Sequence, residues 1–196
     1  MLARLECLVS LLADENERQN LVSHDSLGHI WQRHVADSMQ LLSHVPRETP
    51  LPWLDLGTGA GFPGLVIAAT RPGQRVILTE SRSRRADWLR RAVQSLDLSN
   101  VEVIGQRLET LDQLSVSVIS ARAFAPLDRL LKLAARFSTG DTYWVLPKGR
   151  SAREELDGLI GWAHNFEVVQ SVTDPSAGIV IGTLAGVRTR EKGRSA

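Results

Sequence analysis

The chain has 196 residues, of which 43% are hydrophobic and 23% are charged. This is the composition of a globular protein with one domain-sized core, and no apolar stretch approaches the roughly 18 residues of a membrane span. The formal net charge is +1, and there is a single cysteine, Cys7. One cysteine excludes an internal disulfide and a Cys-x-x-Cys zinc site, which favours a reducing, cytoplasmic setting.

Residues 1–50 are expected to be mostly helical and to cap one side of the fold. Leucines recur at helical spacing between residues 2 and 12, which predicts an amphipathic helix and not a signal peptide. Further along, the segment RHVADS places Arg33, His34 and Asp37 on one helical face. Two interpretations stay open for this face: a polar network that docks the cap, or part of the wall of a substrate pocket.

From residue 51 to 187 short β-branched runs alternate with helical ones. Strands are predicted at 52–57, 75–81, 101–105, 115–120, 142–147, 166–172 and 178–187. Helices are predicted at 62–70, 83–98, 126–137 and 151–164. The alternation predicts a seven-stranded, mostly parallel α/β sheet with helices on both faces, and the last two strands predict a hairpin with one antiparallel strand. We therefore expect a single domain over 1–196, with a cap at 1–50, a core at 51–187 and a frayed basic tail at 188–196.

The segment DLGTGAGFPG lies between the first predicted strand and its helix. In a doubly wound sheet, ligands bind at this position, and glycine lets a ligand approach the backbone closely. A dinucleotide fingerprint, G-x-G-x-x-G, counted from Gly57 requires a glycine at position 62, where Phe62 stands. The spacing from Asp55 is instead D-x-G-x-G-x-G, which resembles motif I of the S-adenosylmethionine-dependent methyltransferases. A nicotinamide-dependent dehydrogenase is therefore disfavoured.

The second predicted strand tests this interpretation. A cofactor that contains ribose needs a carboxylate about 20 residues beyond the glycines to accept from its hydroxyls. Glu80 ends that strand, 21 residues after Gly59. We therefore expect Glu80 to hold the ribose, although a carboxylate at a strand end can also simply face solvent.

Several segments, in chain order, resemble the GidB/RsmG family of bacterial methyltransferases, which modify N7 of a guanine in 16S ribosomal RNA. They are NLVS (20–23), RHVADS (33–38), DLGTGAGFPG (55–64), SRRADWL (83–89), QRLET (106–110), ARAFAPL (121–127) and LPKG (146–149). The resemblance implies a class I, Rossmann-like fold that uses S-adenosylmethionine. The chain differs from the family's pattern at three places. SRSRR stands where members often have a glycine and a lysine before the arginine, and Pro147 precedes Lys148 where members commonly read LKG. The segment before Asn20 is shorter than in members, which suggests a truncated start.

The resemblance also implies site residues. Arg122 corresponds to the family's arginine at the methyl-donor site and is the expected catalytic residue. It could hold the guanine O6, an RNA phosphate or the methionine carboxylate of the cofactor, and we favour the carboxylate because arginine binds it in two-point fashion. The implied cofactor-binding residues are Gly57, Gly59, Phe62, Glu80, Leu108, Glu109 and Arg122.

RNA binding is predicted from charge and from the chemistry of the target atom. Seven arginines lie between Arg71 and Arg91 against two acidic residues, a footprint for phosphates or a solvated helix face. The candidate RNA-binding residues are Arg82, Arg84, Arg85 and Lys148. Phe124 is a candidate for stacking on the base. Because guanine N7 has a lone pair and no proton, its methylation by in-line displacement needs no general base.

The expected partner is 16S ribosomal RNA or the small ribosomal subunit, with no metal, no membrane and a monomeric state. Two alternatives stay open: a class I methyltransferase acting on a small molecule or a protein, and a noncatalytic RNA-binding or assembly factor. The intact glycine loop, together with Glu80 and Arg122, argues against the noncatalytic factor.

Overall fold

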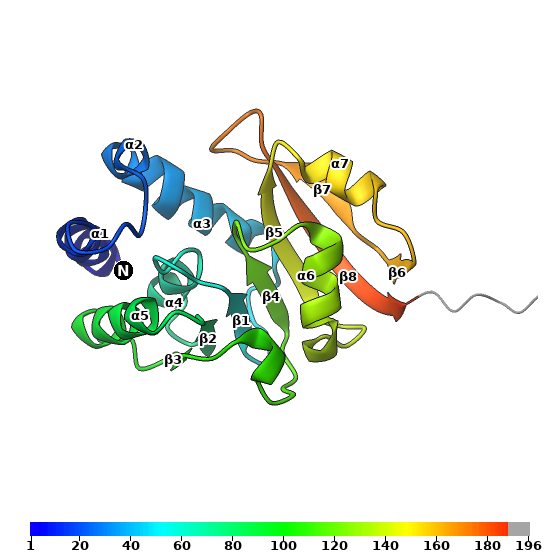
Figure 1. Ribbon diagram of the computed structural model, residues 1–196, viewed down its shortest axis with the longest axis horizontal. Coiled ribbons are helices and arrows are strands. Elements are labelled where there is room, and N and C mark those ends of the chain that lie inside the picture. The colour runs from blue at the N-terminus through cyan, green and yellow to red at the C-terminus, as the bar shows by residue number, and fades with distance from the viewer. Residues whose placement is uncertain (188–196) are drawn as a thin grey trace, which may run out of the picture.

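A computed structural model of the protein describes residues 1–187, so the predicted tail at 188–196 lies outside the described residues. Within residues 1–187 the chain forms one eight-stranded sheet with helices on both faces (Figure 1). The strands are β1 Trp53–Leu56, β2 Val76–Thr79, β3 Val101–Ile104, β4 Val118–Ala121, β5 Tyr143–Gly149, β6 Trp162–His164, β7 Glu167–Gln170 and β8 Gly178–Val187. The α-helices are α1 Leu2–Asn16, α2 His24–Gly28, α3 Asp37–Met39, α4 Gly64–Thr70, α5 Ser83–Ser95, α6 Leu127–Ala134 and α7 Ala152–Asp157. Shorter helical segments are η1 Trp31–Ala36, η2 Gln40–His44, η3 Leu108–Thr110 and η4 Ala135–Phe137.

The strand order is β3-β2-β1-β4-β5-β8-β6, and β7 also pairs with β8. Strands β1 to β5 are mutually parallel, whereas β8 runs antiparallel to β5, β6 and β7. The predicted α/β class, the parallel sheet and the terminal antiparallel strand are therefore confirmed. The strand order reverses between β1 and β4, and the carboxyl edge at this switch point is where open α/β sheets bind ligands.

The edge of the sheet beyond β8 differs from the sequence prediction. The helix predicted at 151–164 ends at Asp157, and Trp162–His164 forms β6 instead. Gly158 and Gly161 follow the helix, and Trp162 pairs with Val187 of β8. Strands β6 and β7 lie end to end along β8. The strand predicted at 166–172 is β7, whereas β6 was not predicted and brings the sheet to eight strands instead of the expected seven. Glycine is a poor helix former, whereas strand pairing and burial of Trp162 stabilise the extended conformation.

Alternating side chains of the strands build a hydrophobic core on each face of the sheet. On β1, Trp53 faces one core and Leu54 the other, and both are fully buried. The first core packs against α1, α4 and α5, and the second against α6 and α7. Figure 1 shows these two groups of helices on opposite sides of the sheet. Strands buried on both faces leave their carboxyl-end loops as the accessible part of the sheet.

The N-terminal cap consists of α1 to η2 and lies over the first core. Leu5, Leu8 and Leu12 of α1 are buried there. The Asn16 side-chain oxygen accepts from the backbone N–H groups of Leu21 and Val22, which turns the chain toward α2. The cap reaches the carboxyl edge of the sheet with η1 and α3, where Arg33 and Asp37 bond Arg122 directly after β4. Figure 1 shows α3 running toward the sheet.

Candidate functional site

The glycine loop after β1 is held from below by a buried carboxylate. Asp55 is fully buried, and its two carboxylate oxygens accept from the backbone N–H of Gly64 and from the hydroxyls of Thr58 and Ser120, at 3.1, 2.9 and 2.7 Å. Burial raises the pKa of Asp55 to about 6, although these hydrogen bonds oppose the shift. The carboxylate therefore ties the loop to the start of α4 and to β4.

Two glycines of the loop have a conformation that side chains disfavour. Gly57 and Gly59 both have φ of +60°. A Cβ atom added at Gly57 would collide with the ring of Phe124, which lies against this backbone from the loop after β4. The glycines therefore leave a short stretch of backbone open to close approach.

Glu80 closes the other side of this loop. It is buried, and its two oxygens accept from the backbone N–H groups of Gly59 and Arg82, at 3.1 and 2.8 Å. A carboxylate offers about four acceptor positions, so each oxygen can still accept from a ligand hydroxyl. Glu80 thus joins the loops that follow β1 and β2.

A pocket of about 530 Å³ lies over these loops and brings together four of the predicted cofactor positions: Gly57, Glu80, Leu108 and Glu109. This volume is within the range of small-molecule and cofactor sites. Its wall contains an apolar surface on Leu108 and Leu133 and polar groups around it. The residues therefore fit a nucleoside-containing cofactor. Three further residues line the pocket and were given no role from the sequence: Gln106 and Arg107, which begin the QRLET segment, and Arg129, which belongs to no motif.

The other predicted cofactor residues lie beside this pocket. Gly59 donates to Glu80, as described, and Phe62 is buried under the loop. The Phe62 ring stacks on His34 with centroids 4.9 Å apart, and the Arg122 guanidinium lies 5.3 Å from the Phe62 centroid. Phe62 and Arg122 therefore form a layer between the glycine loop and the cap.

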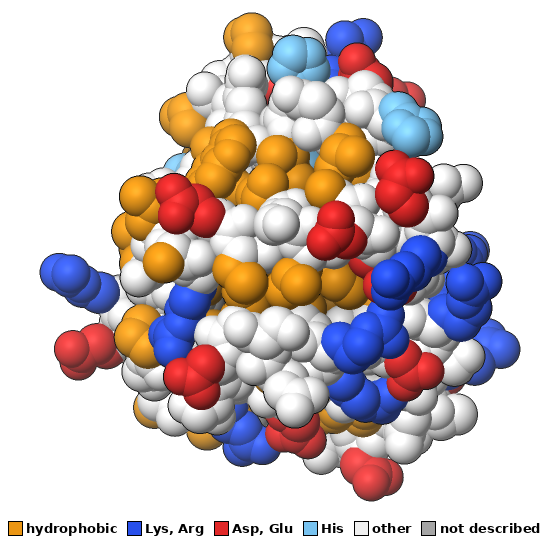
Figure 2. All heavy atoms as spheres, turned by 90° about the vertical axis from the view of Figure 1, so that its left-hand side faces the viewer, with side chains coloured by type: hydrophobic (Ala, Val, Ile, Leu, Met, Phe, Trp, Pro, Cys, Tyr) orange, Lys and Arg blue, Asp and Glu red, His pale blue; other side chains and the backbone are white. Residues whose placement is uncertain are grey.

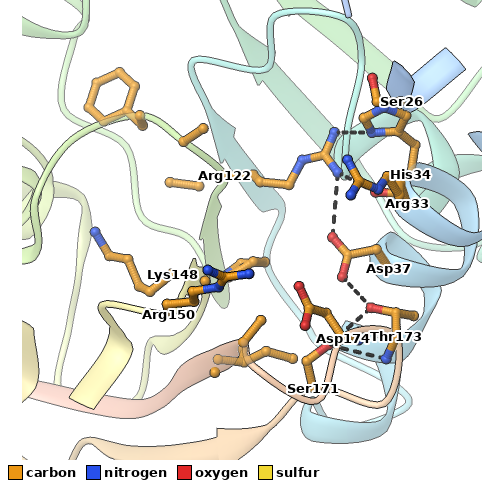
Figure 3. A pocket seen from close by; sticks show the side chains of 18 of the residues that line it. Ser26, Arg33, His34, Asp37, Arg122, Lys148, Arg150, Ser171, Thr173 and Asp174 are labelled. Atoms are coloured by element: carbon orange, nitrogen blue, oxygen red, sulfur yellow. Dashed lines mark hydrogen bonds and ion pairs between the residues drawn. The ribbon is translucent and has the colours of Figure 1, made fainter. Parts of the chain in front are cut away.

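Arg122 is held by three groups of the cap. Its Nη2 lies 2.8 Å from Nδ1 of His34, and its Nη1 donates to the backbone carbonyl of Arg33 at 3.0 Å and to Asp37 at 3.4 Å (Figure 3). Within the described residues, its Nε–H and one Nη2–H have no partner. Two donors are therefore left for a ligand.

A second and larger pocket, of about 1140 Å³, adjoins the first (Figure 3). It lies between the cap, the loop after β4 and the β7–β8 loop, and Phe124 and Ala125 line both pockets. Apolar surface from Pro126, Pro147 and Ile179 lines its floor and walls. A ligand in the larger pocket would thus reach the cofactor pocket across the Phe124 segment.

Asp37 joins three segments around the larger pocket. One oxygen contacts Arg122, and the other accepts from the Thr173 hydroxyl at 2.7 Å and from Gln40 at 2.7 Å. Gln40 also bonds Ser171 of the β7–β8 loop. The RHVADS face is therefore both a docking network and a pocket wall, so the two interpretations of this segment are compatible.

Lys148 lies at the carboxyl end of β5 with its ammonium buried. It bonds the carbonyl of Ala125 at 2.6 Å and pairs with Glu155 at 2.9 Å, and its side chain is 7% exposed. Glu155 also accepts from the backbone N–H of Leu127. Burial tends to raise the pKa of Glu155, but bonds from Ser151, Lys148 and Leu127 outweigh it and lower the pKa. The pair fixes the loop that carries Phe124, which leaves the ammonium poorly placed for an RNA phosphate.

Much of the predicted basic stretch is engaged in contacts within the protein. Arg75 pairs with Glu102, Arg90 with Asp87, and Arg91 with Glu15 of α1. Figure 2 shows acidic side chains among the basic ones on the face that carries α1 and α5.

The three predicted RNA-binding arginines of this stretch differ in their surroundings. Arg84 donates to the carbonyl of Arg18 in the cap. Within residues 1–187, the guanidinium groups of Arg82 and Arg85 have no hydrogen-bond or ion-pair partner. Arg82 lines the cofactor pocket, and Arg85 lies beside Gly59.

Two features are absent from the described part of the chain: a metal-binding group of side chains and a membrane-spanning helix. Among residues 1–187, no three His, Cys, Asp or Glu side chains are grouped so that they could hold a metal ion. In the same range, no helix has the length and apolar character needed to cross a bilayer.

Comparison with known proteins decides the family. The profile of GidB, rRNA small subunit methyltransferase G, matches residues 1–172. The chain belongs to this family. It is 60% identical over 180 residues to the ribosomal RNA small subunit methyltransferase G of Erythrobacter litoralis, covering 91% of this chain and 86% of the relative. It is 58% identical over 186 residues to that of Novosphingobium aromaticivorans, covering 93% and 80%. The chain is thus an S-adenosylmethionine-dependent methyltransferase, as the sequence predicted.

Solved structures support the fold assignment. A SAM-dependent methyltransferase from Aquifex aeolicus superposes with a TM-score of 0.61 at 19% identity, covering 86% of this chain and 97% of that one. Aeropyrum pernix fibrillarin with bound S-adenosyl-L-methionine gives a TM-score of 0.59 at 18% identity, covering 76% and 73%. At this identity the likeness concerns the fold alone, and it agrees with the class I methyltransferase architecture.

Proposed function

We propose that the protein transfers a methyl group from S-adenosylmethionine to N7 of a guanine in 16S ribosomal RNA. The observation that carries the proposal is the pair of adjoining pockets that share Phe124 and Ala125. The smaller is lined by four of the predicted cofactor residues, and the larger, at about 1140 Å³, is at least as large as ordinary small-molecule sites. The relatives' name, ribosomal RNA small subunit methyltransferase G, supports the RNA substrate.

We propose the following tasks for the predicted cofactor residues. The backbone at Gly57 and Gly59 allows close approach, Glu80 accepts from the ribose hydroxyls, and Leu108 and Glu109 bound the adenine. The Nε–H and Nη2–H donors of Arg122 suit the methionine carboxylate, because arginine binds carboxylates in two-point fashion. When bound, the cofactor supplies an electrophilic methyl group on a sulfonium.

The chain's contribution to the methylation step is positioning. Guanine N7 presents a lone pair and no proton, so no side chain has to remove one. N7 would attack the methyl carbon in line with the C–S bond, and that bond would break so that S-adenosylhomocysteine leaves as a neutral thioether. Holding the base against the methyl donor is worth about 7–11 kcal/mol as effective molarity. Phe124, at the junction of the two pockets, provides a flat apolar surface on which a base can stack, an interaction worth about 1–3 kcal/mol.

The substrate nucleotide must be unpaired or flipped out, because N7 lies in the deep major groove of A-form RNA, which side chains cannot enter. We propose Arg82, Arg84 and Arg85 as phosphate contacts. Lys148 is proposed to act indirectly, by fixing the loop that carries Phe124. We further propose that the protein acts as a monomer in the cytoplasm.

The proposal is tested with small ribosomal subunits from a bacterium that lacks this methyltransferase. Purified enzyme and methyl-labelled cofactor are added, and the rRNA is digested and analysed for 7-methylguanosine by mass spectrometry. Strand scission by borohydride and aniline then maps the modified guanine. Gly57→Asp is the inactive control.

The expected result is one 7-methylguanosine per subunit with the wild-type enzyme and none with the variant. A methyl group at another atom or in another RNA would overturn the N7 assignment. Cofactor turnover on small molecules or proteins with no RNA product, or cofactor binding without any turnover, would favour the two alternatives.

A further inference from the structure

His34 lines the larger pocket beside Arg122, and the proposed function gives it no task. It lies in η1, a π-helical segment, and π-helical turns occur frequently at functional sites. It lines the larger pocket and is only 8% exposed. The Ser38 hydroxyl bonds the His34 carbonyl at 2.6 Å, which fixes the residue in this turn.

The two ring nitrogens of His34 have different surroundings. Nδ1 lies 2.8 Å from Nη2 of Arg122. Because arginine can only donate, Nδ1 must accept, and the proton of a neutral ring is on Nε2. Nε2 is buried and has no hydrogen-bond partner among the described residues. A buried N–H without a partner is costly, so this group is a candidate donor to a ligand.

The ring is also neutral under ordinary conditions. Burial, followed by the nearby charges of Arg122 and Arg33, lowers the pKa of His34 to about 4. A neutral donor suits a base whose N7 becomes cationic on methylation, since a fixed positive charge at the same place would oppose the product. His34 can therefore donate beside N7 without the penalty that an arginine or lysine would carry.

On the edge that carries N7, guanine presents two acceptors, N7 and O6, whereas adenine presents N7 and an amino donor at the 6-position. We propose that the Nε2–H of His34 donates to O6 of the target guanine and thereby selects guanine over adenine. The inference rests on the proposed function and adds a specificity-determining residue to it. With adenine, the 6-amino group and the His34 Nε2–H would be two donors facing each other. With 2-aminopurine, which has only a hydrogen at the 6-position, the Nε2–H would have no acceptor.

Replacing the base tests this with the wild-type enzyme alone. The guanine mapped above is replaced in ligated 16S rRNA by inosine, which keeps N7 and O6, or by 2-aminopurine, which keeps N7 and lacks O6. The rRNAs are assembled into small subunits and kcat/KM for methyl transfer is measured. We expect inosine to stay within about threefold of guanine and 2-aminopurine to lose at least about tenfold, the effect of one unmade hydrogen bond.

Two variants then connect the loss at O6 to His34. In His34→Asn the amide oxygen takes the Nδ1 position and can accept from Arg122, but nothing reaches the Nε2 position. In His34→Gln the amide nitrogen reaches the Nε2 position. We expect His34→Asn to methylate guanine and 2-aminopurine rRNA at rates within threefold of each other, and His34→Gln to retain part of the preference for guanine.

Cofactor affinity, measured by calorimetry, separates this role from a structural one. Unchanged affinity in His34→Asn together with the lost preference supports the inference. A tenfold loss of affinity with the preference intact would overturn it and assign Nε2–H to the cofactor carboxylate. Equal rates of the wild-type enzyme on guanine and 2-aminopurine would overturn it without any variant. If natural subunits receive no methyl group, the proposed function fails and the inference fails with it.

Discussion

At the scale of single residues, Asp55 and Gly57 show how the cofactor loop is built. The Asp55 carboxylate is buried beneath the loop and ties it to α4 and β4, while Gly57 provides a left-handed backbone that packs directly against Phe124. Asp55 thus holds the loop through hydrogen bonds to its buried carboxyl group, whereas Gly57 allows close packing because it has no side chain. Each property can be changed separately.

The raised pKa of Asp55 predicts a pH dependence of stability. Protonated Asp55 is favoured in the folded state, so its contribution is fully present below the unfolded pKa of 3.8 and is lost as pH rises through about 6. This difference corresponds to about 3 kcal/mol in the free energy of unfolding. In urea unfolding from pH 4 to 7, Asp55→Asn should gain about this much relative to the wild-type protein. If the free energies of unfolding of the two proteins changed equally between pH 4 and 7, the prediction would be wrong.

Gly57→Ala is expected to weaken cofactor binding by at least about tenfold. The φ of +60° disfavours a side chain, and the new Cβ atom would displace Phe124. The strain should also lower the free energy of unfolding by about 1–2 kcal/mol. Calorimetry with S-adenosylmethionine measures the affinity. The matched control is Gly73→Ala, where a Cβ atom meets nothing within 4 Å and affinity should not change.

At the scale of elements, the loop between β4 and α6 depends on a contact from another part of the chain. Lys148 at the end of β5 and Glu155 on α7 bond the backbone on both sides of Pro126. This loop carries Arg122 and Phe124, so the position of both depends on α7. The helix is short, ending at Asp157, but it provides this partly buried carboxylate.

Glu155→Ala is expected to lower the free energy of unfolding by about 3–5 kcal/mol, because it leaves the buried Lys148 ammonium without its counter-ion. Asp87→Ala is the control: it also removes a helical carboxylate from an ion pair, but its pair with Arg90 is exposed. Its effect should stay below about 1 kcal/mol. Denaturant unfolding measures both, and equal effects would show that burial of the Lys148–Glu155 pair contributes nothing.

At the scale of the whole molecule, the arginine-rich stretch contains two kinds of arginine, those paired with carboxylates and those without a partner among residues 1–187. Several arginines pair with carboxylates on α1, β3 or their own helix, whereas Arg82 and Arg85, at the start of α5 beside the cofactor pocket, have no partner within the described residues. The net charge of +1 therefore hides a local excess of positive charge near the site.

RNA affinity should depend on the unpaired arginines and not on the paired ones. We expect Arg82→Ala/Arg85→Ala to weaken binding of 16S rRNA and to reduce the slope of log affinity against log salt by about 2, about 1 for each phosphate contact. Arg75→Ala, which removes a charge paired with Glu102 before β2, should leave the slope unchanged. Filter binding across a salt series measures both, and the reverse ranking would place the RNA elsewhere.

The amino-acid sequence by itself determined the family, the cofactor class and the alternation of strands and helices. These depend on residues close together in the chain, such as the glycines from Gly57 to Gly64 and the strand that ends just before Glu80. Local periodicity wrongly extended the helix after Ser151, because the competing partner of Trp162 is β8, which comes later in the chain. A pattern read from neighbouring residues cannot include pairing with a strand that comes about 20 residues later.

Only the tertiary structure decided which side chains are free to act. Lys148 was expected to contact RNA, but Glu155 and the Ala125 carbonyl hold its ammonium. Arg122 and His34 are 88 residues apart in the chain, and their contact leaves Nε2 of His34 without a partner among residues 1–187. Hydrogen bonding and desolvation depend on neighbours in space, so the sequence could name these residues as candidates but could not assign their partners.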